Sequence, residues 1–177
     1  SGERNWKGEL TFPQETVNKM VKKVYEMNVP LLLHCNGDGA IDSFLKAYEF
    51  ARDGNFDKSW NVTTIHSQFM RKDQIPKFVK YKIRPSFYTL HTYYFYEAHL
   101  KNRGFAQAQY ISPMRDAINA GLKPTNHTDF VVAPLDQKEL YLTEYINHCQ
   151  RIVDSCLDIG VIILGYLESK QLITLNS

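Results

Sequence analysis

Three short runs of strand length constrain what this chain can fold into more than any other feature of its sequence. Each run leads into a residue that can bind a metal ion or transfer a proton: residues 29–33 into His34, residues 62–65 into His66, and residues 124–128 into Asp129. Helical stretches separate the runs. Polar residues at the carboxyl ends of successive strands in a β-helix-β series meet at one face of the sheet, where α/β enzymes place their chemistry. The sequence therefore predicts a site assembled from three strands.

The stretches between these runs carry helical periodicity. Apolar residues recur at helical spacing and predict helices over residues 13–27, 41–50, 72–81 and 113–120. A further strand is predicted over 84–89, and the last strand of the series over 122–129. Residues 93–96 form an aromatic block, which we interpret as core or pocket wall because no basic residue is interleaved with it. Beyond it, the pattern predicts a helix over 137–157 and two short strands, 161–164 and 172–175.

This order of elements predicts the fold class. Strands that alternate with helices form a parallel sheet with right-handed crossovers. Four such units are half of a (β/α)8 barrel, which typically needs about 250 residues, whereas this chain has 177. We therefore expect an α/β fold, a partial (half) TIM-like barrel with about four parallel strands, covering helices and a short β tail. No repeat or linker divides the sequence, so residues 1–177 are predicted to form a single domain.

The composition narrows the classes of partner. A net charge of +2 with 23% charged residues gives no reason to expect nucleic acid or an anionic membrane surface. No stretch approaches the roughly 20 apolar residues of a membrane span. The cysteines, Cys35, Cys149 and Cys156, lack C-x-x-C spacing, which favours reduced thiols in a cytoplasmic protein. We expect neither nucleic acid nor membrane as a partner.

One glycine-containing turn partly matches the motif of dinucleotide-binding sites. Gly37-Asp38-Gly39 follows one predicted strand and opens a helix, as the dinucleotide fingerprint does. The third glycine of that fingerprint would fall at position 42, which holds Asp42. A nucleotide-binding α/β domain is therefore the most distant of the alternatives.

Two histidines and one aspartate are the candidates for metal chemistry. His34 and His66 stand one βαβ unit apart, and neutral imidazole is a common ligand for zinc and similar ions. Asp129 could bind the same metal and accept a proton from water. The alternative is that all three only cap their strands through hydrogen bonds. The residues by themselves leave both interpretations open.

Three further residues are candidates for substrate binding. His91 and His99 flank the aromatic block. On a helix we expect them not to share a face, whereas in a loop they could line a pocket. Arg115 could pair with a substrate carboxylate, although arginines form surface ion pairs more often.

Several motifs follow one another in a specific order and spacing: HCNGDGA at residues 34–40, TTIHSQ at 63–68, ISPMRDA at 111–117, NHTDF at 126–130 and PLD at 134–136. Together they resemble the metal-dependent amidohydrolase superfamily, in particular the branch called amidohydrolase family 3, or YtcJ-like. The resemblance covers residues 8–140 and corresponds to the carboxyl-terminal half of the barrel. Residues 141–177 are interpreted as a diverged helix and a short β tail.

The resemblance implies a hydrolase that acts on carbon–nitrogen bonds other than peptide bonds, in a small amide-like substrate. His34 and His66 match the histidines of the fifth and sixth strands that hold the metal. Asp129 matches the aspartate of the eighth strand, which acts as general base and then as general acid. The implied cofactor is a divalent metal, with zinc the expected ion. A zinc site normally takes three protein ligands plus water, a number that His34, His66 and Asp129 supply.

The chain also departs from the family pattern. The H-x-H pair of the first strand and the bridging ligand of the fourth have no counterpart, and none of the six histidines forms an H-x-H. We therefore expect this half barrel to be weak or inactive by itself, and its open edges to drive formation of a homo-oligomer such as a homodimer. The second hypothesis is a truncated, non-catalytic homologue that acts as a binding or assembly module. Metal content separates the two hypotheses.

Overall fold

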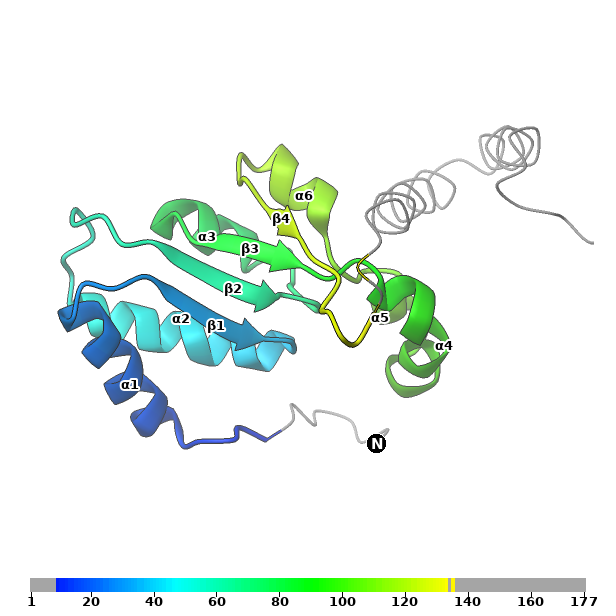
Figure 1. Cartoon of the computed structure of the whole chain (residues 1–177), viewed down its shortest axis with the longest axis horizontal. Helices are drawn as coiled ribbons and strands as arrows, with labels where there is room; N and C mark the ends of the chain where they lie inside the picture. The colour runs from blue at the N-terminus through cyan, green and yellow to red at the C-terminus, as the bar shows by residue number, and fades with distance from the viewer. Residues whose placement is uncertain (1–8, 134, 136–177) are drawn as a thin grey trace, which may run out of the picture.

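A parallel sheet forms the centre of the computed structural model, which describes residues 9–133 and 135 of the chain. Within these residues the sheet has four strands in the order β1-β2-β3-β4 (Figure 1). The elements along the chain are α1 (Gln14–Glu26), β1 (Leu31–Cys35), α2 (Asp38–Arg52), β2 (Val62–His66), α3 (Ile75–Tyr81), β3 (Arg84–Phe87), α4 (His91–Arg103), α5 (Phe105–Ala108), α6 (Met114–Asn119) and β4 (Thr125–Asn126).

The register of the sheet brings the carboxyl ends of the strands together. Cys35 pairs with His66, His66 with Phe87, and Phe87 with Asn126. The backbone N–H of His127 continues the ladder and donates to the carbonyl of Phe87 at 3.0 Å. In Figure 1 the arrowheads of β1, β2 and β3 all point toward the side where α4 and α5 lie. Residues that follow the strands therefore share one rim.

The hydrophobic core lies between the sheet and its helices. Helix α2 contributes Ile41, Phe44 and Tyr48, each no more than 2% exposed, and the sheet contributes Val62 and Phe87. Burying a side chain of this size contributes about 1.5–3 kcal/mol. The core fixes the sheet and hence the positions of the strand ends.

The opposite face of the sheet is exposed along β1 and at the start of β3, whereas its residues on β2 are half-buried and Ser86 of β3 is buried. Along β1, Leu31 and Leu33 are half-buried against the core, whereas Leu32 is 67% exposed and His34 is also exposed. Arg84 at the start of β3 is exposed as well. Parallel sheets are normally covered on both faces. The four parallel strands, alternating helices and partly exposed second face are those of a partial TIM-like barrel, as the sequence predicted.

Some predictions about the elements were wrong. The predicted last strand, 122–129, is reduced to Thr125–Asn126, and a helix that was not predicted, α4, occupies the segment around the aromatic block. Residues 93–96 were interpreted as core or pocket wall, yet Tyr93 is 67% exposed and Tyr94 and Phe95 are also exposed. Four consecutive aromatic residues point around a helix rather than along one side, so they give no apolar stripe. The predicted helix 137–157, the strands 161–164 and 172–175, and the tail 141–177 fall outside the described residues.

Two findings bear on the cysteine and membrane predictions. Cys35 is a free, buried cysteine, and burial raises the pKa of its thiol to about 12. Such a thiol is unreactive at neutral pH. The helices of the described region include none with the length and apolar character that crossing a bilayer requires.

Candidate metal centre

Three side chains at the carboxyl rim of the sheet converge on one point. His66 ends β2, and His127 and Asp129 follow β4; one ligand atom from each lies within 4.8 Å of the other two. Strand β3 separates β2 from β4, so their backbones are about 9–10 Å apart. Side chains from both sides bridge that gap above the end of β3. The group of His66, His127 and Asp129 is called the rim trio below.

Two members of the rim trio sit on left-handed backbone. His66 has φ of 72° and Asp129 has φ of 53°, while Ser67, directly after His66, has φ of 45°. This conformation costs a residue with a side chain about 1–2 kcal/mol, and such strain concentrates at ligand sites. The fold therefore holds these two side chains in positions that regular strand backbone would not give them.

The hydrogen-bond partners of the buried ring nitrogens bear on whether the rim trio can bind a cation. Within the described residues, His66 Nδ1 and His127 Nε2 are buried and have no hydrogen-bond partner. The backbone N–H of Asp129 donates to His127 Nδ1 at 3.1 Å, which leaves the proton of that ring on Nε2. Ligation by either nitrogen of His127 therefore requires this contact to open, so that the ring can change its tautomer or free Nδ1. An unsatisfied buried polar group costs about 1–3 kcal/mol. Two imidazoles and a carboxylate whose ligand atoms lie within 4.8 Å of one another are a donor set that suits a divalent cation.

The electrostatics keep the two histidines of the rim trio neutral. Burial, with the nearby His34 and His127, lowers the pKa of His66 to about 4 against the opposing charge of Asp129. Burial also lowers the pKa of His127, against the opposing charge of Asp129. Metal ligation requires neutral imidazole. Both rings are therefore neutral at neutral pH, as ligation requires.

The rim trio differs from the set that the sequence predicted by one residue. His34, the third predicted ligand, is exposed at the end of β1, and its ring lies 4.5 Å from that of His66 between centroids. His34 is thus at the edge of the centre, and its role as a ligand stays a prediction. His127 was missed as a ligand. Both His127 and Asp129 lie beyond β4, which ends at Asn126, so strand periodicity gave no signal for His127.

The predicted substrate-binding histidines meet each other beside the rim trio. His91 Nδ1 lies 3.2 Å from His99 Nε2, and the His91 ring lies 6.4 Å from that of His66 between centroids. The expectation that a helix would keep them apart was wrong. Eight residues advance a regular helix by about 80° past two full turns and by about 12 Å along its axis, yet the structure brings the two ring nitrogens within 3.2 Å. Arg115 is exposed on α6, and its proposed role in substrate binding stays a prediction.

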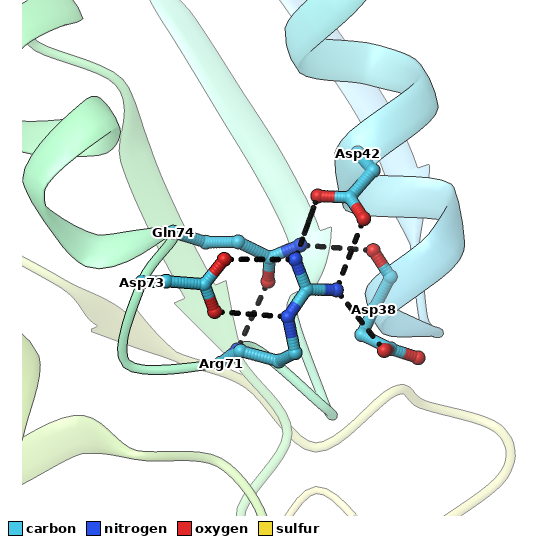
Figure 2. Close-up of polar contacts among 5 residues, drawn as sticks. All are labelled: Asp38, Asp42, Arg71, Asp73 and Gln74. Atoms are coloured by element: carbon cyan, nitrogen blue, oxygen red, sulfur yellow. Dashed lines mark hydrogen bonds and ion pairs between the residues drawn. The ribbon is translucent and has the colours of Figure 1, made fainter.

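A charged cluster braces the loop that follows His66 (Figure 2). The guanidinium of Arg71 donates to Asp38 at 3.1 Å and to both oxygens of Asp42 at 3.0 Å, and it also pairs with Asp73. Gln74 Nε2 donates to the Asp38 carbonyl and to Asp42. The cluster joins the loop after β2 to the start of α2. It therefore fixes the segments that follow His34 and His66 relative to each other.

A parallel α/β sheet with imidazole and carboxylate groups at its carboxyl rim places this structure in the class of partial TIM-like barrels. The chain belongs to the amidohydrolase family, whose family model matches residues 3–141.

Solved structures support the fold. An uncharacterized metal-dependent hydrolase from Pyrococcus furiosus superposes with a TM-score of 0.61 at 18% identity, over 75% of this chain and 30% of that one. A second, from Pyrococcus horikoshii OT3, gives 0.68 at 17% identity, over 80% and 28%. This chain thus spans less than a third of the length of these two structures. A comparison with curated protein sequences gave no match.

Proposed function

We propose that this chain is the carboxyl-terminal half of the barrel of a YtcJ-like, metal-dependent amidohydrolase that cleaves carbon–nitrogen bonds in small amide-like molecules. Membership of the amidohydrolase family supports the hydrolase class. The rim trio is the observation that carries the proposal, because its ligand atoms gather within 4.8 Å at the rim where barrel enzymes bind substrate.

We propose zinc as the ion. Two imidazoles and one carboxylate are three protein ligands, the number that catalytic zinc takes while it keeps a position open for water or substrate. His66 and His127 would hold the ion through neutral rings, and Asp129 would contribute a carboxylate oxygen. A bound divalent ion supplies the positive charge that acidifies water and polarises a carbonyl.

Asp129 is the proposed proton carrier. Its carboxylate accepts a proton from the attacking water and later donates that proton to the leaving nitrogen. Its φ of 53° and the hydrogen bond from its own backbone N–H to His127 fix its backbone beside the ring. His91 and His99 lie next to this centre and are proposed to contact the substrate or its metal.

The length of the chain bears on its activity. It covers 30% and 28% of the two metal-dependent hydrolase structures, and one face of its sheet is exposed along β1 and at the start of β3. We propose that the isolated chain hydrolyses amides weakly or not at all, in a cytoplasmic setting. A non-catalytic module for binding or assembly is the second candidate, and the same exposed face supports it.

A matched pair of aspartate variants tests the proposal. Asp129 and Asp53 both have positive φ, at 53° and 45°, and Asn tolerates this backbone, so neither Asp→Asn change strains the chain. In a spectrophotometric assay of simple amides with the zinc-loaded full chain, Asp129→Asn should lower kcat/KM by about 100-fold or more. Asp53→Asn should leave kcat/KM unchanged. A folded chain that binds no divalent metal refutes the enzyme and supports the module.

A further inference from the structure

A buried arginine lies at the end of the molecule opposite the rim trio. Arg52 is the last residue of α2 and is only 3% exposed. It precedes the loop that joins α2 to β2, and in Figure 1 this loop lies on the side of the sheet away from α4 and α5. The amino ends of the strands are on this side, whereas the rim trio is at their carboxyl ends. Arg52 is therefore separate from the candidate metal centre.

Two nitrogens of the Arg52 guanidinium have no hydrogen-bond partner. Nε and Nη1 are buried, and within the described residues neither donates to an acceptor. A guanidinium stays charged in proteins, and a buried charge is normally paired with an opposite one. Glu49 lies one turn earlier on α2, but its carboxylate accepts from the Tyr81 hydroxyl at 2.7 Å and pairs with Lys77 at 3.4 Å. The charge of Arg52 is thus left for another anion to neutralise.

Three aromatic rings surround this guanidinium. Its central carbon lies 5.2 Å from the ring of Tyr25 and 5.7 Å from those of Tyr48 and Phe56, measured to the ring centroids. The faces of aromatic rings attract a cation, but they are poor acceptors for N–H groups. The rings therefore shield the charge of Arg52 and leave its hydrogen-bonding capacity unused.

Two lysines add positive charge around the same rings. Lys58 Nζ lies 4.9 Å from the centroid of the Tyr25 ring, and Lys80 Nζ lies 5.9 Å from that of Phe56. Each lysine thus shares an aromatic neighbour with Arg52. Like charges repel, and positive charges gathered beside low-dielectric walls attract anions. The surroundings of Arg52 consequently favour a bound anion.

We propose that Arg52, Lys58 and Lys80 bind a phosphate group at the amino ends of the strands, either inorganic phosphate or the phosphate of a small molecule. A planar guanidinium offers N–H groups that match two phosphate oxygens, and the two lysines supply the further charge that a dianion needs. Phe56 is 40% exposed and lies outside the hydrophobic core, so it is the ring that an entering anion can displace. Binding here does not depend on the proposed function, because no residue of the rim trio takes part.

Calorimetric titration of the full chain with inorganic phosphate, at an ionic strength held constant with NaCl, tests the proposal. The wild type should bind phosphate at a single site. Arg52→Gln should weaken that affinity by about tenfold or more, because it removes the charged, bidentate donor. Lys58→Gln and Lys80→Gln should each weaken it by about two- to fivefold, because solvent and salt screen exposed charges. Lys46, an exposed lysine on α2, is the matched control, and Lys46→Gln should leave the affinity unchanged.

A rim variant separates this site from the proposed metal centre. His66→Asn should retain the wild-type phosphate affinity, and loss of phosphate binding in this variant would assign the phosphate to the rim trio and overturn the proposal. A wild-type chain that binds no phosphate, or an affinity that Arg52→Gln does not change, also overturns it. Should Arg52→Gln fail to fold, the two lysine variants decide: weaker binding supports the site, and unchanged binding overturns it.

Phenyl phosphate identifies the source of the phosphate group. Tighter binding of phenyl phosphate than of inorganic phosphate supports the site with a phosphorylated aromatic molecule as its ligand, since the rings around Arg52 would then contact the phenyl group. Equal affinity supports the site with free phosphate as its ligand.

Discussion

The position of His66 shows how one residue can serve both the fold and the site. It ends β2 and is only 5% exposed, yet its Nδ1 has no hydrogen-bond partner in the described region. Its φ of 72° adds conformational strain to that cost. A side chain that is buried, strained and unsatisfied at once is poorly explained by packing. Ligation of a cation relieves the unsatisfied nitrogen.

The ranking of the rim histidines is a prediction at the residue scale. His127→Asn should weaken Zn²⁺ binding more than His34→Asn does, because His127 belongs to the rim trio and His34 lies beside it. Loss of a supporting residue typically costs 10–100-fold in metal affinity, so loss of a ligand should cost about 100-fold or more. Competition with a chromogenic chelator measures both affinities. Equal losses would place His34 among the ligands, as the sequence predicted.

At this scale the sequence predicted part of the site. Strand periodicity located the end of β2 and therefore His66, since a strand end fixes where its last side chain lies. Asp129 was found as a candidate, but it lies three residues past the end of β4. Strand periodicity missed His127, because the polar residues of 124–128 hid where the strand ends. It also missed the contact between His91 and His99, which depends on helix formation that the aromatic block does not signal.

At the scale of elements, the charged cluster around Arg71 connects two neighbouring βα loops. Its contacts to Asp38 and Asp42 on α2 and to Asp73 in its own loop hold the segment after His66 against the start of the helix after His34. These side chains are partly exposed, so solvent screens each ion pair and each contributes modestly. The shared guanidinium nevertheless holds the loop after β2 in a fixed position against the start of α2.

The pH dependence of stability tests this cluster. Burial raises the pKa of Asp42, but hydrogen bonds from Arg71 and Gln74 outweigh burial and lower it below 3.8. A carboxyl whose folded pKa is lowered stabilises the fold above its unfolded pKa, and that stability is lost as the pH falls through the folded pKa. Asp42→Asn should therefore destabilise the chain by about 0.5–1 kcal/mol near neutral pH. As the pH falls through the lowered pKa of folded Asp42, the variant and the wild type should converge.

Denaturant unfolding at a series of pH values measures this difference. The Arg71→Gln background is the control, because Asp42→Asn should have little effect once the guanidinium is absent. A destabilisation by Asp42→Asn that stays constant from neutral to acid pH would show that the ion pair is not its cause.

The elements themselves were predicted unevenly, for a physical reason. Where apolar residues face the core, as in α2 and β2, periodicity gave the correct element type. Helix α4 has no buried residue, so no core-facing stripe existed to reveal it. Strand β4 has two residues, and both pair with β3. The length of β4 is therefore set by this pairing and not by the β-propensity of residues 122–129.

At the scale of the whole molecule, the exposed face of the sheet is the feature that bears on assembly. Leu32, exposed by 67% in the middle of a parallel strand, lies where a closed barrel would bury it. A strand interior of this kind favours association. We propose a second copy of this chain as the covering partner, because the four strands described here, taken from two copies, make the eight strands that a closed barrel contains.

Sedimentation equilibrium tests that proposal with two single substitutions. The wild-type chain should sediment at twice its monomer mass. Leu32→Asp places a charge on the exposed face, so it should weaken dimer affinity by about tenfold or more and shift the protein toward the monomer. Val79, an apolar residue exposed by 40% on α3 and thus on the helical layer, is the matched control, and Val79→Asp should leave the dimer intact. A wild-type monomer would assign the covering role to additional barrel strands of a longer polypeptide. Dimerisation unaffected by Leu32→Asp would place the contact elsewhere, because a buried unpaired carboxylate at the centre of the sheet is incompatible with a tight interface.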